Sequence, residues 1–177
     1  MPLPKIAFVA PLIRAGLATL QASMPEQVAL FNAEGNAQIV TPATMHFGGT
    51  DLLSAFEFPQ LELAGVAGDS GPFSIDRTEF DHDPRLTCGI WVQGAKGEIP
   101  ELYEQVLGLV RCAIECLAPR NAFGPGVELS QAGGISYRID VVPQDLTAAQ
   151  PSAGRDFQNW LGSGMISFHL ETVERLS

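Results

Sequence analysis

The chain has 177 residues, 46% of them hydrophobic, and its 20 Asp and Glu residues outnumber 10 Lys and Arg, for a formal net charge of -10. This length predicts a single domain, 1–177, that buries its own core. The acidic excess, with basic residues spread singly, argues against a protein that binds nucleic acid through its phosphates. No apolar segment of the sequence is long enough to span a bilayer.

An amphipathic helix is predicted over residues 6–23. Apolar residues recur there at helical spacing, and Arg14 interrupts the apolar run that a secretion signal needs, so a helix of the mature chain is favoured. Met24 and Pro25 are expected to end this helix. Residues 26–50 then predict short strands or irregular structure separated by turns.

A long hairpin is predicted next. The segment AFEFPQLELAGV, residues 55–66, has the pattern of a strand, and Pro59 argues for an edge or a bulge rather than a central position. Residues 65–72 are rich in turn formers, and residues 73–80 regain strand character. An acidic turn at residues 81–84 is expected to lead into the following strand.

The clearest unit of the sequence covers residues 86–117. Its first part predicts a period-two strand with one apolar face, made by Leu86, Cys88, Ile90 and Val92. Its second part, IPELYEQVLGLVRCAIECL, has an apolar stripe at helical spacing, with Pro100 in the first turn and Pro119 just beyond the end. Acidic residues suit the positive end of this helix: Glu98, Glu101 and Glu104. A sheet packed on a helix follows.

Two further strands complete the predicted sheet. Residues 122–134 form a glycine-rich connection, and residues 135–141 alternate as a half-buried strand. A long connection over 143–164 contains RDFQNWLG, and MISFHLETVE closes the chain as a strand. The predicted fold class is α+β, a mixed and largely antiparallel sheet packed against an N-terminal helix and a long central helix.

The one local group of oxygen and nitrogen donors comprises Glu79, Asp81, His82 and Asp83. Such donors suit a divalent metal or an acid–base centre, so a small metal-dependent hydrolase is one alternative. A hairpin turn rich in acidic residues explains them without chemistry. Ser70 in GDSGP resembles the surroundings of a serine nucleophile, but no triad accompanies it. The glycines near residues 124 and 133 lack the lysine of a phosphate-binding loop.

The cysteines argue for reduced thiols. There are three, and Cys112 and Cys116 lie four apart on the predicted helix, where they suit core positions better than a disulfide. The three histidines are scattered, which argues against a zinc site. We therefore predict no catalytic residue, no cofactor and no bound metal.

Large side chains in the late part of the chain are candidate protein contacts. Phe157, Trp160 and Leu161 either cover the chain's own sheet or anchor a neighbouring subunit, and Trp160 is the stronger candidate. The loops expected at 65–73 and 143–164 are long and mixed in polarity, which favours contact with partners. The candidate interface residues are Phe73, Arg155, Phe157 and Trp160.

Taken in order, these elements resemble the tail terminator proteins of long-tailed bacteriophages, the tail-completion family. The likeness covers most of the chain. It rests on the helix at 6–23 and on the segments FEFPQLEL, DHDPRLTCGIWVQG, EIPELYEQVLGLVRCAIECL, ISYRIDVVP and MISFHLETVE.

The resemblance implies a structural, non-enzymatic virion protein of the tail and neck, assembled in the host cytoplasm. It implies a homo-oligomer, a hexameric ring that caps the tail tube, ends its polymerisation and binds the neck or head-completion protein. Ring closure would satisfy sheet edges and create two unlike faces, and an acidic lumen would let DNA pass without specific binding. Another head-tail connector, such as a stopper or adaptor, or a minor tail protein, is the alternative.

Overall fold

The computed structural model describes residues 9–35, 37–48, 58–72, 79–130, 134–143 and 159–175. For 66–72, 79–83, 96, 159 and 172–175 the description covers the backbone alone. The elements follow in this order: α1 (Val9–Ala33), β1 (Thr44–Phe47), β2 (Gln60–Pro72), β3 (Glu79–Ala95), the 3-10 turn Lys96–Glu98, α2 (Ile99–Leu117), β4 (Glu128–Leu129), β5 (Ile135–Pro143) and β6 (Asn159–Arg175).

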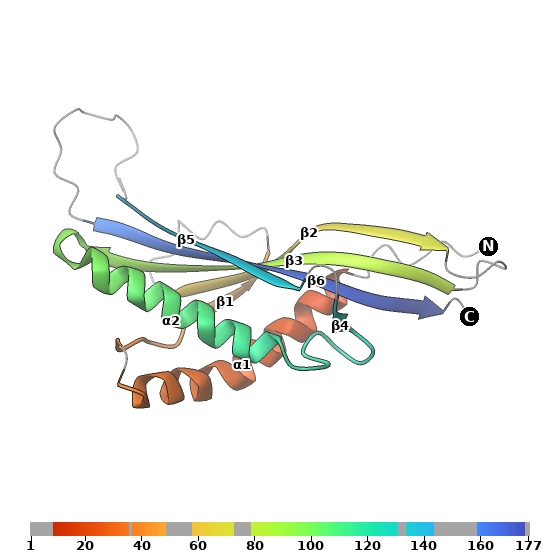
Figure 1. Ribbon diagram of the computed structural model, residues 1–177, viewed down its shortest axis with the longest axis horizontal. Helices are drawn as coiled ribbons and strands as arrows, with labels where there is room; N and C mark the ends of the chain where they lie inside the picture. The colour runs from red at the N-terminus through yellow and green to blue at the C-terminus, as the bar shows by residue number, and fades with distance from the viewer. Residues whose placement is uncertain are drawn as a thin grey trace.

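The described strands form one sheet in the order β1-β2-β3-β6-β4, with β5 also paired to β6. β1 and β2 run parallel, and every other described pair is antiparallel. Both helices lie on the same side of this sheet, while β2, β3 and β6 continue beyond them as a three-stranded arm (Figure 1). The predicted α+β class is confirmed.

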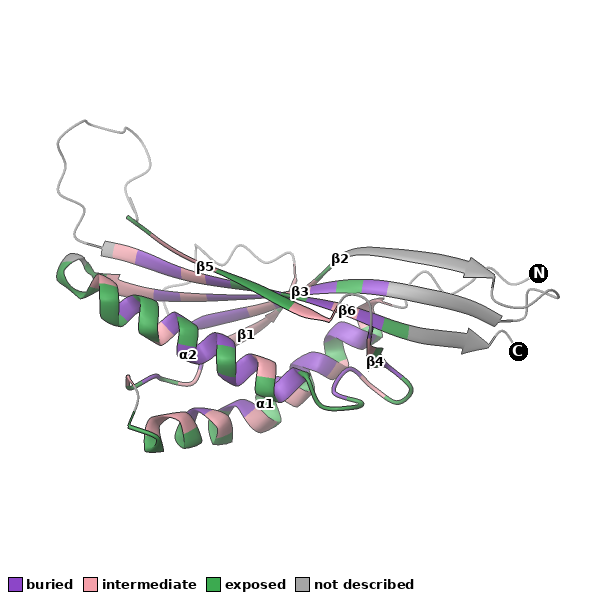
Figure 2. Ribbon diagram, in the orientation of Figure 1, coloured by how far each residue is buried: buried purple, intermediate pink, exposed green. Residues whose placement is uncertain are grey.

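One hydrophobic core joins the helices to the sheet. α1 packs over β1 and β2, and α2 packs over β3, β5 and β6. Buried residues line the sides of both helices that face the sheet (Figure 2). The predicted strand face at 86–92 and the predicted stripe of α2 both enter this core, as do Ile166, Phe168 and Leu170 of β6.

The first helix differs from its prediction at its end. α1 continues through Pro25 to Ala33, ten residues beyond the expected end at Ser23. Met24 and Val28 are buried and extend the apolar stripe of the helix, so packing against the core outweighs the hydrogen bond that the exposed Pro25 cannot donate. Residues 26–33, expected as strand or irregular structure, are therefore helical.

The predicted hairpin exists, but its details were wrong. β2 is an inner strand between β1 and β3. Pro59 does not prevent this position, because it precedes the first residue of the strand, and its carbonyl accepts the N–H of Ala43 at 3.0 Å. The segment 65–72, expected as a turn and a contact loop, belongs to β2. The acidic turn expected at 81–84 lies inside β3, paired with residues 68–71.

The end of the chain was also misassigned in part. β5 appears where it was predicted, and it extends to Pro143. β6 begins at Asn159, so Trp160 and Leu161 belong to a strand and not to the connection expected over 143–164. The described glycines of the 122–134 connection have positive φ, at Gly124, Gly126 and Gly134.

The two layers approach each other closely where α2 crosses β6. A Cβ added at Gly162 would lie 2.6 Å from a methyl carbon of Val106, and one added at Gly164 would lie 2.5 Å from a methyl carbon of Val110. Those valines are one helical turn apart, and a helix allows a valine essentially one side-chain rotamer. α2 can therefore rest on the backbone of β6 only because these two strand positions lack side chains.

The three cysteines lie in the same core, and all are free thiols. Burial raises the pKa of the Cys88 thiol, and it raises the pKa values of Cys112 and Cys116 from 9.0 to about 11 each. Near neutral pH these groups are therefore protonated and act as small apolar side chains.

Replacing Gly162 with Ala is expected to lower the free energy of unfolding by about 1 to 3 kcal/mol, because the new methyl group meets Val106 and Leu102 in a filled core. Urea unfolding measures this. The matched control is Gly97→Ala, since a Cβ at Gly97 meets nothing within 4 Å. Equal stability of the two variants would show that the approach is not close.

The buried thiols predict a loss of stability at alkaline pH. In the unfolded chain the thiols ionise near their ordinary pKa of 9.0, whereas in the fold Cys112 and Cys116 hold their protons to about 11. The folded state then binds more protons, so the free energy of unfolding should fall as pH rises from 9 to 11. A variant with Cys112→Ala and Cys116→Ala should lose less over that interval, and an identical decline would refute the assignment.

Candidate interaction surface

A surface of mixed polarity runs along the outside of α2 toward β5. It holds a groove of about 700 Å³ whose lining includes Phe31, Glu104, Leu107, Arg111 and Tyr137. Large side chains are exposed to solvent here: Leu107 (39%) and Tyr137 (57%) in the lining, and Tyr103 (47%) on the same helix outside the lining. Exposed aromatic and aliphatic groups next to a groove are typical of protein contact surfaces.

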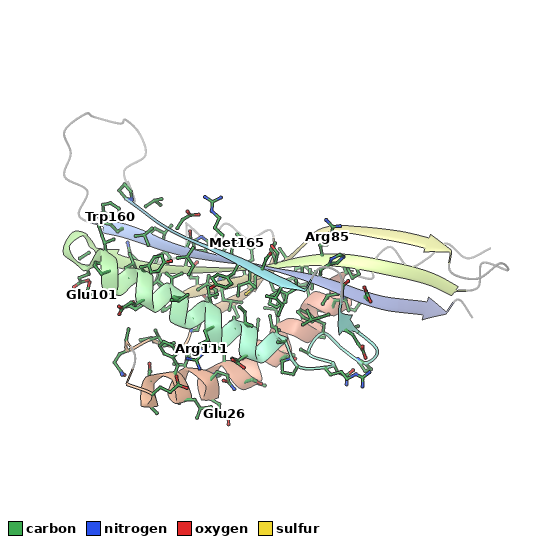
Figure 3. The ribbon with its side chains drawn as sticks, in the orientation of Figure 1. Glu26, Arg85, Glu101, Arg111, Trp160 and Met165 are labelled. Carbon is green, nitrogen blue, oxygen red and sulfur yellow. The ribbon has the colours of Figure 1, made fainter. Side chains whose placement is uncertain are left out.

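Arg111, one of the residues that line this groove, lies between α1 and α2 (Figure 3). Its Nη1 lies 2.9 Å from Oε2 of Glu34, its Nη2 donates to Oε1 of the same carboxylate at 3.3 Å, and its guanidinium stacks over the Phe31 ring at 5.8 Å. Phe31 in turn packs where α2 carries Gly108, since a Cβ there would lie 2.8 Å from the ring. Both side chains of the ion pair are about half exposed, so the pair contributes little to the stability of the fold.

β5 borders this surface as an edge strand. Among the described residues it pairs only with β6. None of its nine residues is buried, and Ser136, Tyr137, Arg138, Val142 and Pro143 are exposed. An exposed strand edge offers unpaired N–H and C=O groups to another chain.

Trp160 lies at the start of β6, opposite Gly94 of β3 and Pro143 of β5. Its side chain is partly buried and packs against the core near the beginning of α2 (Figure 3). Its indole N–H is buried and has no hydrogen-bond partner within the described part of the chain. The residue therefore covers the chain's own sheet, and its role as an intersubunit anchor stays a prediction.

The other candidate interface residues, Phe73, Arg155 and Phe157, lie outside the described residues. Sequence reasoning missed Tyr103, Leu107 and Tyr137. A signal for the first two was present, because they lie four residues apart on the polar side of α2, away from its apolar stripe. Tyr137 was assigned to a half-buried face, whereas the edge position of β5 leaves it exposed.

The acidic group at residues 79–83 occupies consecutive positions of β3. Ser70 of β2 is the register partner of His82. The side chains of this group lie outside the description, and within it no cluster of three His, Cys, Asp or Glu residues could hold a metal ion.

The acidic residues at the start of α2 have local roles. Oε2 of Glu98 accepts the N–H of Ala95 at 3.4 Å, and Glu101 occupies the first turn of the helix, as expected for its positive end. Neither described helix combines the length and the apolar character that crossing a membrane requires. No model of a known protein family matches the chain, and no curated protein sequence matches it either.

Proposed function

We propose that the protein is a structural component of a long-tailed bacteriophage, a tail terminator whose ring of six caps the tail tube and joins it to the neck. The order of helices and strands along the sequence supports this role. The observation that most supports the ring is that one chain exposes large apolar side chains on two different surfaces. One is the α2 groove with Tyr103 and Leu107, and the other lies around β1, where Val40 and Phe47 are 67% and 41% exposed.

Two unlike surfaces are what a closed ring requires. In a ring, one patch of each subunit binds a different patch of its neighbour. When the ring closes, every copy of these two patches is paired. The ring then has two chemically distinct faces, one for the tube and one for the neck. A face that differs from the tube subunit cannot accept another tube ring, so polymerisation stops there.

The charge of the chain fits a passage for DNA. A net charge of -10 on each subunit gives a ring of six a strongly negative field. A lumen within that field repels phosphates, so DNA crosses it without adhering to the wall. No specific DNA contact is required by this role.

The test combines mass with tube capping. The purified chain is expected to form a species of six subunits, alone or at the tips of tail tubes, seen by sedimentation and negative-stain images, and to halt tube growth. Leu107→Lys should abolish the ring, because a charge would enter the apolar contact.

Ala18→Lys is the matched control, since it adds the same charge at an exposed position of α1. It should assemble as the unmodified chain does. A chain that neither forms a ring nor binds tube tips contradicts the proposal, and binding to the neck alone would favour a stopper or an adaptor.

A further inference from the structure

We propose that two copies of this chain pair through their β5 strands, antiparallel and about a two-fold axis at Ile139. Such a contact uses one surface twice, whereas a ring of six uses two unlike surfaces. The inference therefore goes beyond the proposed function and does not depend on it. It rests on the backbone groups of β5 that have no partner within the described residues, and on the order of the side chains along this strand.

Alternate residues of β5 direct their backbone groups away from β6. The N–H of His169 donates to the carbonyl of Gly134 at 3.2 Å, and the Ser163 hydroxyl donates to the carbonyl of Asp140 at 3.5 Å. The backbone N–H and C=O groups of the even-numbered residues of this strand therefore face β6. Because the ladder alternates, the N–H and C=O groups of Tyr137, Ile139 and Val141 face the free edge.

This alternation restricts how a second β5 can pair. Odd-numbered residues must meet odd-numbered residues for their backbone groups to bond. A pair centred on Ile139 meets that condition along the whole strand. It sets Ile139 opposite itself and Tyr137 opposite Val141 of the partner subunit, and it ends at Pro143, the only β5 residue without an N–H.

The charges of β5 are complementary in the same register. Arg138 and Asp140 lie on one face of the strand, and within one chain Arg138 Nε approaches Asp140 Oδ2 to 2.8 Å. Around Ile139, Arg138 faces Asp140 of the partner subunit, and the two-fold axis repeats this contact. Both positions belong to non-hydrogen-bonded pairs, whose Cα atoms approach to about 4.5 Å.

The strand also lacks the usual defences of an edge. Lysines and internal prolines commonly prevent strands from pairing with other chains, and β5 has neither between Ile135 and Val142. Tyr137, on the helix side of the sheet, is 57% exposed and would gain an apolar cover from Val141 of the partner subunit. A second copy therefore fits both the polar and the apolar side of this edge.

The first test measures self-association of the full chain by sedimentation velocity, from about 1 to about 500 µM. The β5 pair is expected in the unmodified chain, and it is expected as a plain dimer in the Leu107→Lys variant, in which the ring cannot form. Arg138→Glu places two carboxylates opposite each other twice, so the dimer dissociation constant should rise about tenfold or more. The exchange of both charges, Arg138→Asp with Asp140→Arg, should restore the dimer.

Arg85→Glu is the matched control, because Arg85 is exposed on β3 and lies away from β5 (Figure 3). It changes the net charge equally and should leave dimerisation unchanged. A chain that stays monomeric throughout, or a dimer that Arg138→Glu leaves intact, overturns the β5 pair. Species of six subunits report on the ring separately, through the Leu107→Lys variant.

The second test fixes the register by cross-linking. In the proposed pair the two Ile139 positions are directly opposite, at a Cα separation of about 5.5 Å, which a disulfide spans. Oxidation of Ile139→Cys should therefore give a covalent dimer. The two Ser136 positions lie about 20 Å apart in that register, so Ser136→Cys should not cross-link. Cross-linking at 136 but not at 139 would refute the two-fold axis at Ile139.

Discussion

The contact of α2 with the backbone of β6 is the constraint on which the rest of the structure depends. Gly162 and Gly164 leave room for Val106 and Val110, so the helix lies directly on β6, the strand that pairs with β3, β4 and β5. α2 also contacts α1, where the Phe31 ring packs against Gly108. The position of α2 on β6 therefore determines where α1 packs. On the outer side of α2, Leu107 lines the groove and Tyr103 is exposed to solvent.

Local periodicity predicts secondary structure well where one face of a helix or strand is buried. The α2 stripe and the strand face at 86–92 were predicted correctly because each residue's burial follows from a spacing visible within one segment. Prediction failed where distant contacts decide. Val28 keeps α1 helical beyond Pro25 by reaching the core, and residues 81–84 are held as strand by β2. Neither partner can be read from the local sequence.

The candidate surface was harder to predict than the fold. Tyr103 and Leu107 were readable, because they interrupt the polar side of a helix whose apolar side was already assigned. The exposed edge of β5 was not, since being an edge depends on which strands lie next to it in the sheet. For the same reason Trp160 was placed in a connection, although its pairing with Gly94 makes it the beginning of a long strand. Contacts with partners are set by such edges.

The most direct test of the central constraint is a double-mutant cycle between Gly164 and Val110, measured by urea unfolding. Gly164→Ala adds a carbon 2.5 Å from a Val110 methyl carbon, and Val110→Ala removes that methyl carbon. We expect the double variant to be more stable than the sum of the two single losses implies, with a coupling free energy of about 1 kcal/mol or more. Additive losses would mean that α2 does not rest on the glycines of β6, and would contradict the central constraint.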